Sequence, residues 1–318
     1  MRLNALSNGW RLDGFGTSID LTPIGLTSAD LADVDDILHD ADRPLESIEP
    51  VAADEVRWTD DGVGPFVVRD HQVVVGLLGA VEIRTRGGEH GAFTRSKTVE
   101  LFAWLATHRD RGTRSGARTA LWELDVRDAT FANVVSEARR GLARLVAPPE
   151  GDEWVARTLT DELPLHELVV TDADLVEERL AHARLQPPPL AIETLRPAVE
   201  LIRGMPFAGT SYLWPDAEGI TSNLVLLAIS AAGEFAGHAL SVGDTEAVFW
   251  ATGRALRVLP GHEDLIGLRM RAHAHAGDLA GVRQEWESYE RVLVADAWSD
   301  GEPAPKLLAL RHELLSSN

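Results

Sequence analysis

The second half of the chain carries apolar residues at intervals of three and four, the spacing of amphipathic helices. Two Gly-Asp steps, Gly243-Asp244 and Gly277-Asp278, lie 34 residues apart, and each separates one apolar helical pattern from the next. A period of 34 residues is typical of tetratricopeptide helix pairs. Three residues match in register across this period: Val248, Val258 and Leu259 with Val282, Val292 and Leu293. The pattern predicts antiparallel helix pairs in residues 167–318, broken near Gly243 and Gly277.

Residues 71–166 change from a strand pattern to a helix pattern and back. Positions 73–83 are rich in apolar and β-branched residues, which predicts strands, and Gly87-Gly88 supplies a turn. Helical spacing follows over about residues 96–108 and 115–122, and a third helix begins near residue 130. Short strand-like runs within residues 153–165 outline a hairpin. Sheet, three helices and hairpin, in this order, are typical of a winged helix-turn-helix.

The third predicted helix has two distinct faces after Asp128 or Thr130, either of which suits an N-cap. Its buried face is predicted from the apolar spacing: Phe131, Val135, Ala138, Leu142 and Leu145. The opposite face carries the polar and charged residues: Asn133, Ser136, Glu137, Arg140 and Arg144. Arg139 lies beside the apolar stripe, which favours a structural salt bridge over a contact with DNA.

The first 70 residues predict a small α+β unit followed by a linker. Glycines break the apolar runs between residues 10 and 24, as in short strands and turns. Residues 27–30 look like a helix start, and residues 44–65 are acidic and rich in Pro and Gly. The fold class expected is therefore mainly α with small β elements. We predict three parts: residues 1–70 as this unit and linker, 71–166 as the winged helix, and 167–318 as the helical repeat.

The amino-acid composition limits where the protein is expected to act and which chemistry it can use. The 318 residues are 45% hydrophobic and 25% charged, and no apolar run approaches the ~18 residues that a membrane helix needs. The first thirty residues lack the pattern of a secretory signal, so we expect a cytoplasmic protein. The absence of cysteine excludes disulfides, thiolate catalysis and zinc sites that use sulfur.

The net charge of −20 by itself argues against binding to nucleic acid. The charge is unevenly distributed along the chain, which changes this expectation. Residues 1–70 hold 5 basic and 15 acidic side chains, and residues 166–318 hold 12 and 22. Residues 71–165 hold 13 of each, and within them residues 95–144 hold 10 basic against 6 acidic. A locally basic element therefore lies inside an acidic protein.

Several short motifs, taken in order, resemble the SARP-type antibiotic regulatory proteins, in which a winged helix precedes a bacterial transcriptional activation domain. The matching segments are Leu78-Gly79-Ala80-Val81-Glu82-Ile83, Arg95-Ser96-Lys97, Ala120-Leu121-Trp122 and residues 135–142. The resemblance covers roughly residues 73–315. It implies that the third helix enters the major groove of DNA, with contacts from Arg114, Arg118, Asn133, Ser136, Glu137, Arg140 and Arg144.

Two residues depart from the family's pattern, which usually has a polar or basic residue at Val134 and a basic one at Glu137. A carboxylate is repelled by phosphate, although Glu also accepts a hydrogen bond from cytosine. The first interpretation is a transcription regulator that binds DNA through the winged helix and binds partners, or itself as a homodimer, through the repeats. The alternative is a protein-protein interaction or scaffold module whose winged helix no longer binds DNA.

Aromatic residues of the repeats are candidates for a groove that holds a partner or a small ligand: Tyr212, Trp214, Trp250 and Trp286. Packing between helices is the commoner role of such residues. His273 and His275 are two apart and point to opposite sides of a helix, so we expect no metal site there. No nucleotide-binding or catalytic motif is found, so we expect neither an enzyme nor a cofactor.

Overall fold

The computed structural model describes the backbone of residues 2–6, 9–14 and 17–21, and residues 64–122, 124–295 and 301–316 in full. The chain divides into two compact units, Met1–Trp58 and Thr59–Asn318. In the first unit, β1 (Arg2–Leu6), β2 (Gly9–Gly14) and β3 (Thr17–Leu21) form an antiparallel sheet in the order β1-β2-β3. The helix predicted from residue 27 lies outside the described residues.

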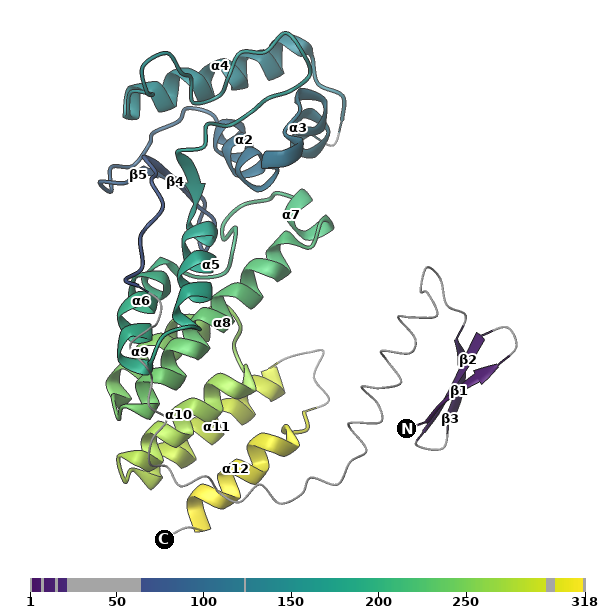
Figure 1. The fold of residues 1–318 in the computed structure, drawn as a ribbon, viewed down its shortest axis with the longest axis vertical. Helices are drawn as coiled ribbons and strands as arrows, with labels where there is room; N and C mark the ends of the chain where they lie inside the picture. The colour runs from purple at the N-terminus through teal and green to yellow at the C-terminus, as the bar shows by residue number, and fades with distance from the viewer. Residues whose placement is uncertain are drawn as a thin grey trace. The chain divides into compact units, whose positions relative to one another are not determined.

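The second unit begins with a sheet and three helices (Figure 1). The strands are β4 (Val73–Gly76), β5 (Glu82–Thr85) and β6 (Val169–Thr171). The helices are α2 (Ser96–Thr107), α3 (Arg114–Leu121) and α4 (Asp128–Leu145), with the 3-10 turn η1 (Arg109–Arg111) before α3. The sheet order is β5-β4-β6, with β4 antiparallel to β5 and parallel to β6. The three predicted helices are confirmed within two residues, whereas β6 was not predicted.

The predicted hairpin is present as a wing with little regular pairing. One bridge joins Val155 to Leu165, and the Ala156 N–H donates to the Pro164 carbonyl at 3.1 Å. The tip of the wing is closed by the Thr158 hydroxyl, which donates to the Glu162 carbonyl at 2.5 Å. The order of sheet, three helices and wing is that of a winged helix-turn-helix.

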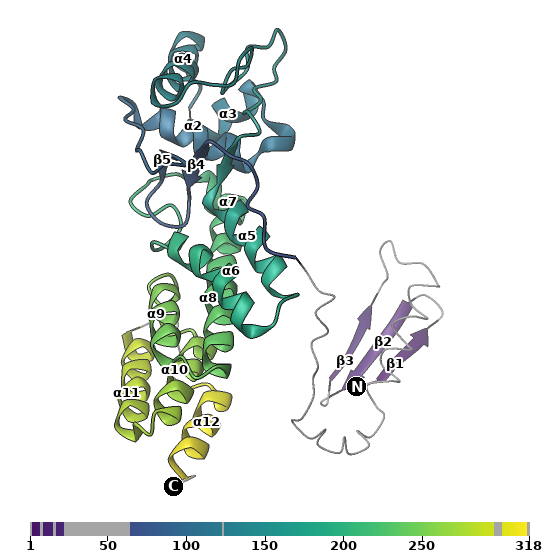
Figure 2. The same cartoon turned by 60° about the vertical axis from the view of Figure 1, so that its left-hand side comes forward.

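The remaining helices form antiparallel pairs (Figures 1 and 2). They are α5 (Asp172–Ala183), α6 (Pro188–Leu201), α7 (Trp214–Ala217), α8 (Ile220–Ser241), α9 (Thr245–Ala255), α10 (Glu263–His275), α11 (Leu279–Ala295) and α12 (Pro305–Ser316). The most extensive contacts are those of α8 with α9, α5 with α6, α6 with α8, and α10 with α11. We call residues 172–316 the helical module.

Both Gly-Asp steps end one helix and begin the next, as the 34-residue period predicts. Gly243 and Gly277 have φ of 80° and 72°, left-handed values that favour glycine at a helix end. Asp244 then caps α9 by accepting from the Ala247 N–H at 2.9 Å, and Asp278 accepts from the Gly281 N–H at 2.8 Å. The tetratricopeptide-like interpretation of this region is confirmed.

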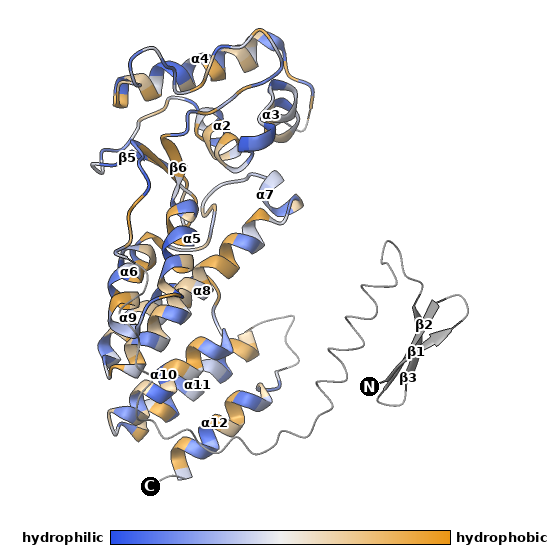
Figure 3. Cartoon of the chain, viewed as in Figure 1, coloured by the Kyte–Doolittle hydropathy of each residue, from blue (hydrophilic) through white to orange (hydrophobic). Residues whose placement is uncertain are grey.

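Apolar and polar residues alternate along the helices of the module (Figure 3). One continuous core joins the winged helix to the module, and a second cluster lies among α10, α11 and α12. One described helix, α8, has the length and apolar composition of a membrane span. Its buried face packs against α6 and α9, which is the ordinary reason for an apolar core helix.

The winged helix and the module are joined by a buried carboxylate. Asp172, which begins α5 and is fully buried, accepts hydrogen bonds from the Leu77 and Leu78 N–H groups at 2.7 and 3.1 Å. The Arg203 guanidinium lies 3.3 Å from Asp172 and 2.9 Å from Glu82. Burial raises the pKa of Asp172 above its usual value, and the bonds from Leu77 and Arg203 offset only part of that rise.

We predict that Asp172→Ala lowers the free energy of unfolding by about 2–4 kcal/mol, because two buried amides and a guanidinium lose their acceptor. Asp172→Asn retains an acceptor for the amides and should cost less. Urea unfolding measures both, with Asp216→Ala, at an exposed position, as the control. A loss below about 1 kcal/mol for Asp172→Ala would contradict this role.

Candidate nucleic-acid interface

The inner face of α4 is fixed by close packing against the rest of the winged helix. Phe131, Val135, Ala138 and Leu142 are buried, as the apolar spacing predicts. Gly141 packs against the Phe93 ring so closely that an added Cβ would lie 2.7 Å from a ring carbon. A glycine inside a helix costs about 1 kcal/mol relative to Ala, and this contact explains why it is tolerated here.

Glu137 does not lie on the outer face of α4, so this part of the prediction is wrong. Its side chain is buried, with relative exposure of 8%. It accepts from the Thr94 N–H at 2.7 Å, from Arg95 Nη1 at 2.8 Å and from the Thr98 hydroxyl at 3.2 Å. The physical reason is that the start of α2 supplies polar hydrogens that need an acceptor. Glu137 therefore fastens α4 to α2.

These contacts determine the ionisation of Glu137. Burial raises its pKa, but the hydrogen bonds from Arg95, Thr94 and Thr98 outweigh this effect, and the pKa falls below its usual value. Its charge is thus held in place by a neighbouring guanidinium. Val134 is buried as well. Neither departure from the family's pattern changes the chemistry of the exposed surface.

The outer face of α4 carries polar and cationic side chains. Asn133, Arg140 and Arg144 are exposed, and Ser136 is half-buried between them. Arg140 Nε donates to the Ser136 carbonyl and Arg144 Nε to the Arg140 carbonyl, both at 3.3 Å. Within the described residues, neither guanidinium has a carboxylate within ion-pair distance. The guanidinium groups of Arg140 and Arg144 thus keep most of their donors for a ligand.

The two candidate arginines on α3 have different surroundings. Arg118 pairs with Asp128 at 2.6 Å and Asp125 at 3.1 Å, and it also donates to the Val126 carbonyl. It holds the α3–α4 loop, so its charge is already neutralised. Arg114 begins α3 half-buried, and its N–H donates to the Asp161 carbonyl at 2.7 Å. Asp128 pairs with Arg118 and does not cap α4. The predicted N-cap is therefore wrong, because the N-cap residue of α4 is Arg127, whose side chain makes no capping hydrogen bond.

Arg139 joins the wing to α4. Its Nε and Nη2 donate to the carbonyls of Val155 and Ala156, each at 2.7 Å. The predicted structural role is present, but carbonyl oxygens take the place of the expected carboxylate. Because these bonds reach consecutive residues of the wing, the wing and α4 are held as one surface.

The four aromatic residues of the module do not line a common groove, which corrects that prediction. Trp214 and Trp286 are buried in separate clusters, because one packs under the winged helix and the other among α10 to α12. Tyr212 stacks on Trp214 with ring centroids 6.4 Å apart. Trp250 is half-buried, packed against Phe235 and two arginines. These contacts are those of helix packing.

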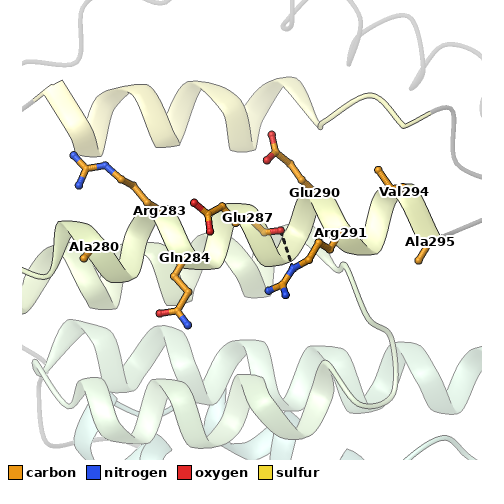
Figure 4. A pocket seen from close by; sticks show the side chains of 8 residues that line it. All are labelled: Ala280, Arg283, Gln284, Glu287, Glu290, Arg291, Val294 and Ala295. Carbon is orange, nitrogen blue, oxygen red and sulfur yellow. Dashed lines mark hydrogen bonds between the residues drawn. The ribbon is translucent and has the colours of Figure 1, made fainter.

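A surface depression of the module lies along α11 (Figure 4). Its described lining residues all come from that one helix: Ala280, Arg283, Gln284, Glu287, Glu290, Arg291, Val294 and Ala295. They mix both signs of charge, and Arg291 Nε donates to the Glu287 carbonyl at 3.3 Å. Among the residues described, no three His, Asp or Glu side chains gather as metal ligands. We assign this depression no ligand.

Comparison with known proteins agrees with this architecture. Residues 171–315 match the model of the bacterial transcriptional activator domain. A solved structure, Mycobacterium tuberculosis EmbR in complex with a low-affinity phosphopeptide, is similar with a TM-score of 0.58 and 20% sequence identity. The match covers 77% of this chain and 65% of the EmbR chain, so this chain spans less than two thirds of that protein. No curated protein matches the chain.

A winged helix followed by a bacterial transcriptional activator domain is the domain order of SARP-type transcription regulators. The resemblance to this family is therefore confirmed, on the matched domain and on the fold.

We predict that Glu137→Gln lowers the free energy of unfolding by about 1–2 kcal/mol at pH 7, because charge-assisted bonds become neutral ones. Since the folded-state pKa of Glu137 is depressed, its stabilisation is present above the unfolded value of about 4.3 and is lost as pH falls through the folded value. Urea unfolding at about pH 7 and pH 3 should show the difference shrinking. Glu150→Gln, at an exposed position, is the control, and a difference independent of pH would refute the assignment.

Proposed function

We propose that this protein regulates transcription in the cytoplasm by inserting α4 into the major groove of DNA. The observation that carries the proposal is the outer face of α4, where Asn133, Ser136, Arg140 and Arg144 lie together without a neutralising carboxylate among the described residues. In a protein of net charge −20, such a surface is unusual. Phosphate and base edges are the ligands that it suits.

The chemistry of these side chains supports both kinds of contact. Arg140 or Arg144 can donate two hydrogen bonds to guanine or to a phosphate, and Asn133 can pair with adenine. Ser136 is suited to a phosphate or a base edge. Because Arg139 fixes the wing to α4, the wing approaches DNA in a set orientation when α4 is in the groove. Arg114, at the start of α3, is proposed to add a phosphate contact, whereas Arg118 and Glu137 act within the fold.

We propose that the helical module binds protein partners and does not bind DNA. Residues 166–318 hold 12 basic and 22 acidic side chains, a balance that phosphate disfavours. We propose that it mediates self-association or contact with the transcription machinery, consistent with the description of the matched domain. The working division is residues 1–70, 71–166 and 167–318, with DNA binding assigned to the second part.

The alternative, an interaction module without DNA binding, rests on Val134, on Glu137 and on the acidic regions that flank the winged helix. Both side chains are buried, so neither weakens the outer face of α4. Selection of bound sequences from a random duplex library tests the choice directly. Enrichment of a motif supports DNA recognition, and no enrichment by the folded protein favours the interaction module.

We predict that the double substitution Arg140→Ala and Arg144→Ala weakens binding to the selected duplex by at least about tenfold, ~1.4 kcal/mol. Arg257→Ala removes the same kind of charge from an exposed site in the module and is the matched control. Fluorescence anisotropy measures the affinities, with circular dichroism to establish folding. Unchanged affinity in the folded double variant would exclude insertion of this face.

We also predict a shallow salt dependence. Because Arg118, Arg139 and Arg95 are engaged within the fold, only about three or four phosphates are neutralised. At about 0.9 per phosphate, the plot of log affinity against log salt should have a slope near −3. Titration between about 50 and 200 mM salt gives this slope, and a value steeper than about −6 would require a second basic surface.

A further inference from the structure

Residues 64–70, which we call the strap, lead into the winged helix but pack on the first helix of the module (Figure 2). Their side chains alternate in the manner of an extended segment. Phe66 and Val68 are half-buried, whereas Val67 between them is 82% exposed. The strap therefore presents one side to the protein and the other to solvent.

Phe66 is the anchor of the strap on α5. The Arg179 guanidinium lies 4.6 Å from the centre of its ring, a cation–π distance. The His182 ring meets it edge-on, with centroids 5.3 Å apart, and His182 Nε2 lies 3.0 Å from the Gly64 carbonyl oxygen. Two residues one turn apart on α5 thus contact the same aromatic side chain.

The other half of the strap reaches the junction of the two domains. Val68 packs against a small cluster of three buried residues, Val74 of β4, Val170 of β6 and Leu175 of α5. Next to it, Arg69 Nε lies 3.2 Å from Glu178 of α5. An aromatic residue, an aliphatic residue and an arginine are therefore recognised in succession.

The strap is held by contacts with side chains, without the backbone pairing of a strand in a sheet. Within the described residues, no backbone-to-backbone hydrogen bond joins residues 64–70 to the rest of the protein; the first comes from the Gln72 N–H. Segments built into a sheet are tied by such bonds at every second residue. The strap is bound like a peptide ligand, through its side chains and through the Gly64 carbonyl that His182 contacts.

We propose that α5 and the adjoining strands β4 and β6 form a peptide-binding surface, and that the strap occupies it in cis. The partner that this surface fits is an extended segment of the pattern aromatic–any–aliphatic–Arg, as in Phe66-Val67-Val68-Arg69. A partner carrying this pattern displaces the strap and contacts the winged helix and the module together. The inference does not depend on DNA binding.

The test uses the full chain with its strap disabled by Phe66→Asp and Val68→Asp. The probe is a fluorescein-labelled synthetic peptide of residues 63–71, followed by fluorescence anisotropy. We expect saturable binding to this variant and at least tenfold weaker binding to the native chain, because a tethered strap competes at an effective concentration of the order of millimolar. Val67→Asp, on the exposed side, is the matched control and should behave as the native chain does.

Two further arms keep the outcome decisive. A peptide with Phe66→Asp should not bind either protein, and the milder Phe66→Ala chain replaces the double variant if circular dichroism shows a folding defect. Arg179→Ala in the strap-disabled chain should weaken binding of the native peptide. Absence of binding to a folded, strap-disabled chain overturns the proposal, as does equal binding to the native and the strap-disabled chains.

Discussion

The arrangement of the Thr59–Asn318 unit depends on one buried carboxylate. Asp172 satisfies two amides of the turn after β4 while it begins α5, so a single side chain belongs to both domains. Arg203 adds a second tie, because its own N–H donates to the Leu78 carbonyl and its guanidinium reaches Asp172 and Glu82. A buried charge is costly unless it is paired and hydrogen-bonded, and these contacts meet that requirement. The winged helix therefore cannot move independently of the module without exposing or orphaning this group.

Internal pairing of charged side chains also determines which cations remain at the candidate interface. Residues 95–144 are rich in arginine, but several of these side chains bind other groups of the fold. Arg95 pairs with Glu137, and Arg118 pairs with Asp125 and Asp128. Arg139 donates to the wing. These internal pairs set the position of α4, the α3–α4 loop and the wing. Arg140 and Arg144 differ because their neighbours are backbone carbonyls. The number of basic residues in this segment thus overstates the cationic charge that is available at the surface.

The strap contacts both the winged helix and the helical module. It crosses the junction that Asp172 holds, and Val68 contacts strands from the sheet as well as α5. Its attachment uses a cation–π contact, an edge-on ring contact, a half-exposed ion pair and one aliphatic contact, each individually modest in water. The two joints differ in their exposure to solvent: the Asp172 side chain is fully buried, whereas the Arg69–Glu178 ion pair of the strap is partly exposed.

The sequence by itself determined the local structure of this protein. Apolar spacing placed α2, α3 and α4, and the Gly-Asp pairs placed two helix boundaries, because glycine conformation and aspartate capping are local properties. The short motifs also indicated the resemblance to the SARP-type regulators, with which the domain matched over residues 171–315 agrees. Only the tertiary structure decided the surroundings of individual side chains. Glu137 is buried because the start of α2 supplies hydrogen-bond donors that need an acceptor. Trp214 is buried because the winged helix covers it. The strand β6 and the strap were also missed, since pairing with β4 and packing on α5 involve residues about a hundred positions apart. Periodicity reports which face of a helix is apolar, but which distant partner a charged side chain meets depends on the folded chain.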